Sequence, residues 1–202
     1  MRITGGIGRG RKLKVPAGQK VRPTSDKVKQ ALFNILGDKV PGSAFLDLFA
    51  GAGGVGIEAL SRGAERVVFV DGDRGSLDVV RHNLEQAGFA GQSEVVLAKA
   101  ETFLNKRSGP YDIVFLDPPY TVEMLPLLQL VNRSGLLKPD SIVIAEHFRK
   151  QPSPGMAGAL MLDREARYGD TVLAFYSMGA RSLESEVGSQ ESEVMTIFGF
   201  RI

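Results

Sequence analysis

The chain of 202 residues contains no cysteine and no tryptophan, and its only histidines are His82 and His147. Without cysteine, neither a disulfide nor a thiolate metal site is possible, and two separated histidines are too few for a histidine-based metal site. No run of about 18 apolar residues is present, and polar and basic residues follow Met1, so we predict neither a membrane span nor a signal peptide. We therefore expect a metal-free cytoplasmic protein with no membrane partner.

Basic side chains are concentrated near the N-terminus, where residues 1–30 hold nine lysines and arginines against one aspartate. The rest of the chain has more acidic than basic side chains. A basic arm on a mildly acidic body is typical of a protein that binds a polyanion, and a solvated charged arm is the alternative. The candidate contacts to nucleic-acid phosphates are Arg9, Arg11, Lys12, Lys14 and Arg22.

Strand and helix patterns alternate with short connections from residue 43 to residue 146. Strands are expected at residues 45–50, 66–70, 94–97, 111–116 and 141–146, and helices at residues 55–62, 74–87, 101–105 and 122–131. This alternation predicts an α/β fold with a doubly wound, Rossmann-like and mostly parallel sheet covered on both faces. Two further strands at residues 160–163 and 171–176, with no helix between them, predict a C-terminal antiparallel hairpin.

The length predicts one domain with tails. We expect residues 1–40 to form a basic arm and a helix packed on the core, residues 41–178 to form the core, and residues 179–202 to form a flexible tail. Thr24 or Ser25 can cap the N-terminal helix. Within the arm, Leu13 and Val15 alternate with two lysines, which predicts a short strand with one basic face.

A glycine-rich turn lies between the first expected strand of the core and the helix that follows it. Its spacing Gly51-x-Gly53-x-x-Gly56 matches the dinucleotide-binding pattern, because glycine allows a ligand to approach the backbone and the helix start offers N–H donors. Asp71 ends the next strand, where an acidic side chain can bind both hydroxyls of a ribose. These features predict an adenosine-bearing cofactor, with a tight turn that binds no ligand as the alternative. Asp47 disfavours a pyrophosphate and favours a ligand with an ammonium and a sulfonium, such as S-adenosylmethionine (SAM).

A second motif, Asp117-Pro118-Pro119-Tyr120, follows the expected strand at residues 111–116. Ligands of open α/β sheets bind beyond the carboxyl ends of the strands. The two prolines fix the backbone so that carbonyl 118 can face a substrate, Asp117 offers acceptors, and Tyr120 offers a ring on which a base can stack. This combination suits an exocyclic amino group of a nucleobase, and an Asp-Pro turn with a buried tyrosine is the alternative.

The sequence Asp-Pro-Pro-Tyr resembles the amino-methyltransferase motif of class I SAM-dependent methyltransferases. Over residues 1–178 the chain resembles one family of that class, the RsmD-type bacterial 16S rRNA guanine-N2-methyltransferases. The matching stretches include Arg-Pro-Thr-Ser-Asp-Lys-Val-Lys at 22–29, Asp-Leu-Phe-Ala-Gly at 47–51 and Tyr-Gly-Asp-Thr at 168–171. The Arg-Pro-Thr segment makes the resemblance specific, because many methyltransferases share the later motifs without it.

The resemblance implies that SAM is the cofactor and that the methyl acceptor is N2 of a guanine in small-subunit ribosomal RNA. It implies that the partner is ribosomal RNA or the small ribosomal subunit. The implied catalytic residues are Asp117, Pro118 and Tyr120. The implied cofactor-binding residues are Asp47, Phe49, Gly51, Gly53, Asp71, Ala100 and Glu101.

One departure from the family pattern is Lys99, which stands where such enzymes commonly carry Asp or Asn. A lysine cannot accept a hydrogen bond from the adenine amino group, so the backbone at Ala100 is expected to serve there. Gly72 likewise lacks a side chain to pack on adenine. Arg22 lies at a helix start and could reach the SAM carboxylate in place of RNA.

The chemistry alone also permits other acceptors. The Asp-Pro-Pro-Tyr motif would serve for another RNA or for adenine N6 in DNA, and only the N-terminal segment favours ribosomal RNA. A non-catalytic RNA-binding assembly factor with the same fold is a third possibility, which the intact motif disfavours. The even charge distribution beyond the arm predicts a monomer.

Overall fold

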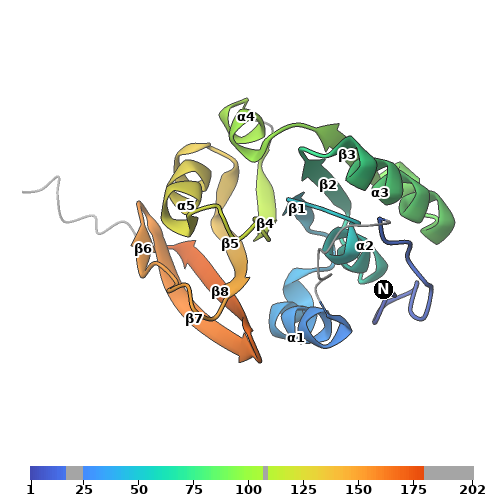
Figure 1. The fold of residues 1–202 in the computed structure, drawn as a ribbon, viewed down its shortest axis with the longest axis horizontal. Helices are drawn as coiled ribbons and strands as arrows, with labels where there is room; N and C mark the ends of the chain where they lie inside the picture. The colour runs from blue at the N-terminus through green and yellow to red at the C-terminus, as the bar shows by residue number, and fades with distance from the viewer. Residues whose placement is uncertain (17–24, 107–108, 180–202) are drawn as a thin grey trace, which may run out of the picture.

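A computed structural model describes residues 1–16, 25–106 and 109–179, so Arg22, Thr24 and nearly all of the expected tail lie outside the described residues. Its centre is an eight-stranded sheet with the order β3-β2-β1-β4-β5-β8-β7-β6 (Figure 1). The parallel strands are β1 (Ala44–Leu48), β2 (Arg66–Asp71), β3 (Ser93–Leu97), β4 (Tyr111–Leu116) and β5 (Leu137–Phe148). The antiparallel strands are β6 (Met156–Ala157), β7 (Leu160–Tyr168) and β8 (Thr171–Met178). The predicted fold class is therefore confirmed.

Helices cover both faces of the sheet, as the alternating pattern predicts. They are α1 (Asp26–Leu36), α2 (Gly54–Ser61), α3 (Arg74–Ala87), α4 (Ala100–Asn105) and α5 (Met124–Arg133), with short 3-10 turns at η1 (Gly37–Lys39) and η2 (Ala90–Gln92). Buried side chains of α1, α2 and α3 form one core with Phe45 of β1, whereas those of α4 and α5 form a second core with Leu46. Successive residues of β1 thus enter opposite cores, and the whole strand is buried.

The parallel register brings the carboxyl ends of five strands to one edge. Leu48 at the end of β1 pairs with Val70 of β2 on one side and with Leu116 of β4 on the other. The glycine turn, Asp71, Lys99, Asp117 and Phe148 follow or end these strands. Residues far apart in the sequence therefore stand in a row, in the order of the strands.

Several element boundaries differ from those that the sequence predicts. β5 begins at Leu137, before the predicted residue 141, and its pairing with β4 shifts register between Tyr111 and Ile113. β7 continues past the predicted residue 163 to Tyr168, and its pairing with β8 shifts register between Leu162 and Arg164. A bulge of this kind interrupts the two-residue alternation on which strand prediction depends. The two-residue β6 lies between the strands predicted at residues 141–146 and 160–163 and is too short to show a pattern.

Residues 1–16 pack onto the helices and form little regular structure of their own. The expected strand is reduced to one antiparallel bridge between Arg2 and Lys12. Leu13 is buried as predicted, but Val15 is 41% exposed because the segment leaves the core at this point. At the start of α1, the Ser25 hydroxyl accepts a hydrogen bond from the Val28 N–H at 3.2 Å, so Ser25 is the helix cap.

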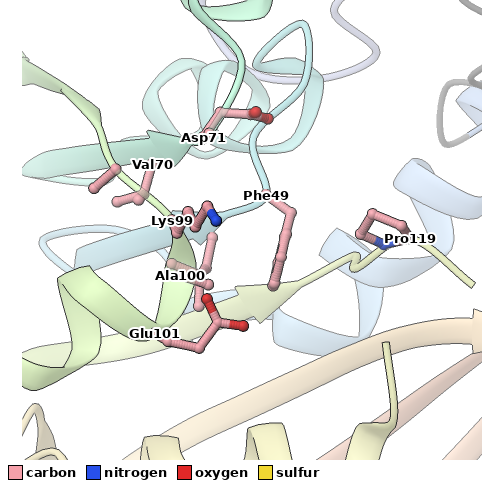
Figure 2. A pocket seen from close by; sticks show the side chains of 10 residues that line it. Phe49, Val70, Asp71, Lys99, Ala100, Glu101 and Pro119 are labelled. Carbon is pink, nitrogen blue, oxygen red and sulfur yellow. The ribbon is translucent and has the colours of Figure 1, made fainter. Parts of the chain in front are cut away.

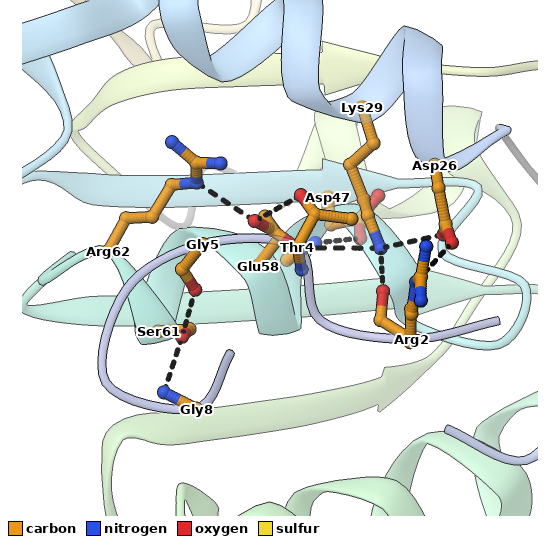
Figure 3. Close-up of polar contacts among 11 residues, drawn as sticks. Arg2, Thr4, Gly5, Gly8, Asp26, Lys29, Asp47, Glu58, Ser61 and Arg62 are labelled. Atoms are coloured by element: carbon orange, nitrogen blue, oxygen red, sulfur yellow. Dashed lines mark hydrogen bonds and ion pairs between the residues drawn. The ribbon is translucent and has the colours of Figure 1, made fainter. Parts of the chain in front are cut away.

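The buried carboxylate of Glu58 in α2 holds the N-terminal segment in place (Figure 3). One oxygen accepts the Thr4 N–H at 2.7 Å, and the other accepts the Thr4 hydroxyl at 2.8 Å and the Arg62 Nε–H at 2.9 Å. The ammonium of Lys29, which is also fully buried, lies 3.4 Å from the same carboxylate and donates to the Arg2 carbonyl. Burial lowers the pKa of Lys29, and the negative charges of Glu58 and Asp26 oppose that shift. The cluster thus joins the N-terminal segment, α1 and α2.

We expect Glu58→Ala to lower the free energy of unfolding by about 3–5 kcal/mol, because it leaves the Lys29 ammonium buried without its main partner. Urea unfolding followed by circular dichroism measures this change. Asp78→Ala is the matched control, since it removes an exposed pair with Arg81 at 2.9 Å and should cost at most about 1 kcal/mol. Equal and small effects of the two substitutions would show that the buried cluster does not hold the segment.

Candidate active site

The turn after β1 has a backbone conformation that glycine favours, and one of its members is a phenylalanine. Gly51 and Gly53 have φ angles of 53° and 76°, and Phe49 has a φ of 71°. Within the described ranges Phe49 is the one non-glycine residue with positive φ. The N–H groups of Phe49 and Ala50 both donate to the Val70 carbonyl, at 2.9 and 3.0 Å, and hold this conformation. Such strain costs about 1–3 kcal/mol and is concentrated at functional sites.

Asp47 lies beneath this turn and binds the first turn of α2. Its side chain is buried, and one carboxylate oxygen accepts the Gly56 N–H at 2.9 Å. Gly56 has no room for a side chain, since a Cβ there would lie 2.3 Å from the Phe69 ring. In a dinucleotide-binding fold the N–H groups at this helix start face a pyrophosphate. Here a carboxylate of the protein already takes one of them, so the site disfavours an anionic ligand.

Asp71 fixes the same turn from β2. Its two oxygens accept the Gly51 N–H at 2.8 Å and the Asp73 N–H at 2.8 Å. A carboxylate has about four lone-pair positions, so both oxygens can still accept a hydroxyl. Asp71 can therefore position the turn and bind a ribose at the same time.

A cavity of about 230 Å³ lies above the carboxyl ends of the first three strands (Figure 2). It is lined by Leu48, Phe49, Val70, Asp71, Gly72, Ala98, Lys99, Ala100, Glu101 and Pro119. The Phe49 ring and the Glu101 carboxylate project into the same space. The structure thus brings together four of the predicted cofactor residues, whereas Asp47, Gly51 and Gly53 do not line the cavity.

The sequence did not predict the apolar lining of the cavity. Leu48 and Val70 are buried strand residues, and Ala98 directly follows β3. The signal that could have found them is position, because each lies at or next to the carboxyl end of a parallel strand. The exposed Lys99 precedes α4, and its side chain makes no capping hydrogen bond to that helix. It therefore adds a cation beside the predicted adenine position.

The Asp-Pro-Pro-Tyr motif leaves β4 directly beside the glycine turn. Asp117 is half-buried and Pro118 is buried, whereas the Tyr120 side chain is 71% exposed, which rules out a buried tyrosine. The Tyr120 ring meets the Phe148 ring edge-on with 6.0 Å between centroids. The Pro119 carbonyl accepts the Val122 N–H at 2.8 Å. In the part of the chain that the structure describes, no backbone N–H donates to the Pro118 carbonyl.

The carboxyl groups of Asp47, Asp71 and Asp117 lie near one another at the ends of β1, β2 and β4. Burial raises the pKa of Asp47 to about 8, the Gly56 N–H opposes the shift, and the charges of Asp117 and Asp71 add to it. Burial also raises the pKa of Asp117 to about 7. A cation placed among these groups would stabilise their ionised forms. The electrostatics therefore fit the ammonium and sulfonium of SAM.

The basic residues of the N-terminal segment do not all face solvent freely. Arg9, Lys12 and Lys14 are exposed, whereas Arg11 donates through Nη1 to the Ala87 carbonyl at 2.5 Å. The Lys14 backbone is held by the Asn83 amide through bonds of 2.8 and 3.0 Å. Asn83 also donates to the Ala52 carbonyl at 3.1 Å, so the segment lies next to the glycine turn.

Within residues 1–16, 25–106 and 109–179, no group of three or more His, Cys, Asp or Glu side chains is placed to hold a metal ion. The helices of these same ranges are all too short or too polar to cross a membrane.

Residues 1–177 match the model of a family described as conserved hypothetical protein 95. The chain is 42% identical over 180 residues to the rRNA methyltransferase YlbH of Bacillus subtilis, covering 87% of this chain and 98% of that protein. It is 35% identical over 182 residues to ribosomal RNA small subunit methyltransferase D of Escherichia coli, covering 90% and 91% of the two chains. The solved structure of the E. coli methyltransferase yhhF superposes with a TM-score of 0.80 at 35% identity, over 90% of this chain and 99% of that one.

We expect Asp47→Asn to stabilise the cofactor-free protein at alkaline pH and to weaken SAM binding. The pKa of Asp47 is about 8 in the folded protein and about 4 in the unfolded chain. The folded state therefore binds more protons over this window, and the contribution of Asp47 to stability falls as pH rises from about 4 to about 8. Asparagine keeps an acceptor for the Gly56 N–H without the charge. Because each pKa unit corresponds to about 1.4 kcal/mol, the gain should reach a few kcal/mol.

Urea unfolding of wild type and Asp47→Asn at about pH 5 and about pH 8.5 measures the effect, with the larger difference expected at the higher pH. Calorimetric titration with SAM should show weaker binding by the variant. An Asp47→Asn protein that is less stable than wild type at the higher pH would contradict this account of the buried carboxylate.

Proposed function

The chain belongs to the conserved hypothetical protein 95 family of RsmD-type methyltransferases, and we propose that it transfers the methyl group of SAM to N2 of a guanine in small-subunit ribosomal RNA. The methyltransferase activity and the cofactor follow from the family. The RsmD family supports the guanine-N2 acceptor, and the geometry described above supports the site residues. The partner is ribosomal RNA or the small ribosomal subunit, so the protein acts in the cytoplasm.

One observation supports this function above all others. The residues that suit SAM and those that suit an amino-bearing base leave adjacent strands, because Leu48 of β1 pairs with Leu116 of β4. Asp117 lies close enough to Asp47 to raise its pKa. The proposed cofactor and acceptor sites would therefore be adjacent, as direct transfer between them requires.

Bound SAM supplies a methyl group that its positively charged sulfur already activates. The protein must orient the guanine amino group, whose lone pair is delocalised into the ring. Hydrogen bonds from the two N2–H groups to the Asp117 carboxylate and to the Pro118 carbonyl would fix the amino group and raise its electron density. Formation of the new N–C bond would be accompanied by cleavage of the methyl–sulfur bond, whose electron pair stays on sulfur in the neutral thioether that leaves. The nitrogen becomes cationic, and Asp117 stabilises this charge and accepts the proton.

The exposed aromatic and basic side chains near the site suit an RNA with an unpaired target base. Tyr120 exposes its ring at the carboxyl edge of the sheet, where a base flipped out of an RNA loop can stack. Arg9, Lys12 and Lys14 expose cationic groups on the segment that borders the glycine turn, where they can bind phosphates without reading sequence. Arg11 contributes less to this surface, because the Ala87 carbonyl takes one of its donors.

Mass-spectrometric mapping tests the proposed acceptor. Small-subunit RNA from cells that lack the protein, incubated with purified protein and SAM, should gain N2-methylguanine at one position. DNA oligonucleotides and other RNAs serve as competing substrates. Methylation of adenine N6, or the absence of transfer to both naked RNA and small subunits, would contradict the proposal.

We expect Asp117→Ala to reduce methyl transfer by about 10²-fold or more, because it removes an electrostatic and general-base partner. SAM affinity should change only a few-fold, which calorimetry measures in parallel. Near-normal turnover by the folded variant would exclude the role assigned to Asp117.

Tyr120 should respond differently to two substitutions. Tyr120→Phe keeps the ring and should retain most activity, whereas Tyr120→Ala should lose about 1–3 kcal/mol of RNA binding, the value for stacking on one base. Binding to a target-loop RNA measures both. An equal loss in the two variants would mean that the hydroxyl acts and that stacking does not.

A further inference from the structure

The row of functional strand ends continues beyond Asp117 to the end of β5. Phe148 is the last residue of β5, and its ring contacts Tyr120. Residues 149–155 then cross from β5 toward β6 and carry two adjacent exposed cations, Arg149 and Lys150. Neither the family motifs nor the basic N-terminal segment includes this stretch, which we call the β5 loop.

Hydrogen bonds fix the β5 loop at both ends and in its middle. The Arg149 N–H donates to the Asp170 carbonyl at 2.8 Å, and the Leu162 N–H donates to the Gly155 carbonyl at 3.0 Å. In between, the His147 imidazole Nε2 lies 2.8 Å from the Ser153 hydroxyl. The loop is therefore held in one shape before any ligand binds, which reduces the cost of binding.

The β5 loop is also joined to the proposed base site. The Gln151 side-chain amide donates to the Tyr120 carbonyl at 3.1 Å. The Lys150 ammonium lies 6.0 Å from the centre of the Phe148 ring, on which it is held by a cation–π contact. One ring thus contacts both Tyr120 and the Lys150 cation, and this places a positive charge beside the ring on which the target base would stack.

The nearby acidic groups leave this charge available. Glu165 of β7 is paired with Arg167 at 2.8 Å. Asp170 contacts the loop through its backbone carbonyl. No described acidic side chain forms an ion pair with Arg149 or Lys150. Two cations that form no ion pair with a described carboxylate, on a fixed loop beside an exposed aromatic ring, match the chemistry of a nucleotide phosphate.

We propose that the β5 loop binds the RNA backbone immediately next to the target guanine, with Lys150 and Arg149 on the phosphates. This inference rests on the proposed function and adds a second RNA surface to it. The two surfaces differ in position, because the N-terminal segment borders the cofactor side of the site and the β5 loop borders the substrate side. The RNA strand would then be held on both sides of the flipped base.

The test compares Lys150→Gln and Arg149→Gln with a matched control, Lys39→Gln, whose exposed lysine lies in η1 before β1 at the opposite edge of the sheet. Binding of a fluorescent target-loop RNA is measured at several salt concentrations, together with steady-state methyl transfer. Each β5-loop variant should weaken RNA binding and raise the KM for RNA several-fold with little change in kcat. Each should also reduce the slope of log Kd against log salt by about 0.7, the value for one phosphate contact on a single strand. SAM binding should stay unchanged, and Lys150→Arg should restore wild-type values.

Each other result identifies which inference has failed. If wild type methylates the RNA but the β5-loop variants keep its salt slope and KM, the loop is not a phosphate-binding surface. If these variants lose activity only on assembled small subunits and bind naked RNA normally, the loop contacts a ribosomal protein and the proposal is wrong. Failure of wild type to methylate any small-subunit RNA would instead contradict the proposed function itself.

Discussion

The hydrogen bond between the Gly56 N–H and the Asp47 carboxylate, 2.9 Å long, is the constraint on which the rest of the site depends. It joins the central strand β1 to the first turn of α2 across the glycine turn, so the turn between them has little freedom. It also occupies one of the N–H groups at the N-terminus of α2, which would otherwise attract an anion. The same bond holds a buried acidic group near the proposed cofactor site, and a bound cation would stabilise its ionised form. The same hydrogen-bonded carboxylate thus fixes the turn, favours a cationic ligand over an anionic one, and makes stability depend on pH.

Helix α2 is also the point at which the N-terminal segment attaches. Its first turn binds Asp47, its middle binds Thr4 through Glu58, and its last residue, Ser61, donates to the Gly5 carbonyl at 2.6 Å and accepts the Gly8 N–H at 2.8 Å. One helix therefore aligns a basic segment with the glycine turn. Any shift of α2 would move both, so the glycine turn and the lysines that we propose to face RNA keep a fixed relation.

The sequence predicted most of the architecture because its signals are local. Alternating strands and helices, the spacing of Gly51, Gly53 and Gly56, and the motif at Asp117 each depend on neighbours along the chain. The bulge in β7, the two-residue β6 and the full length of β5 were missed, because register irregularities depend on the partner strand. The sequence also did not predict the buried pair of Lys29 and Glu58, because one charged residue on each of two helices does not indicate that the two side chains form a contact. At the site, Asp71 and Glu101 were predicted to lie together, whereas the apolar lining depends on where parallel strands end in space.

The row of strand ends divides the candidate active site into two parts that can change independently of each other. The turns after β1, β2 and β3 line most of the cavity, to which Pro119 after β4 also contributes, and the loops after β4 and β5 would face the proposed acceptor. Replacing the β5 loop would alter which acceptor is bound without rebuilding the cavity, because none of its residues lines the cavity. Such a division makes the fold modular, and new specificities can arise or be engineered on one side alone. The limit to this independence is Asp117, whose charge reaches Asp47 across the boundary, so an exchange of substrate loops must keep that carboxylate in place.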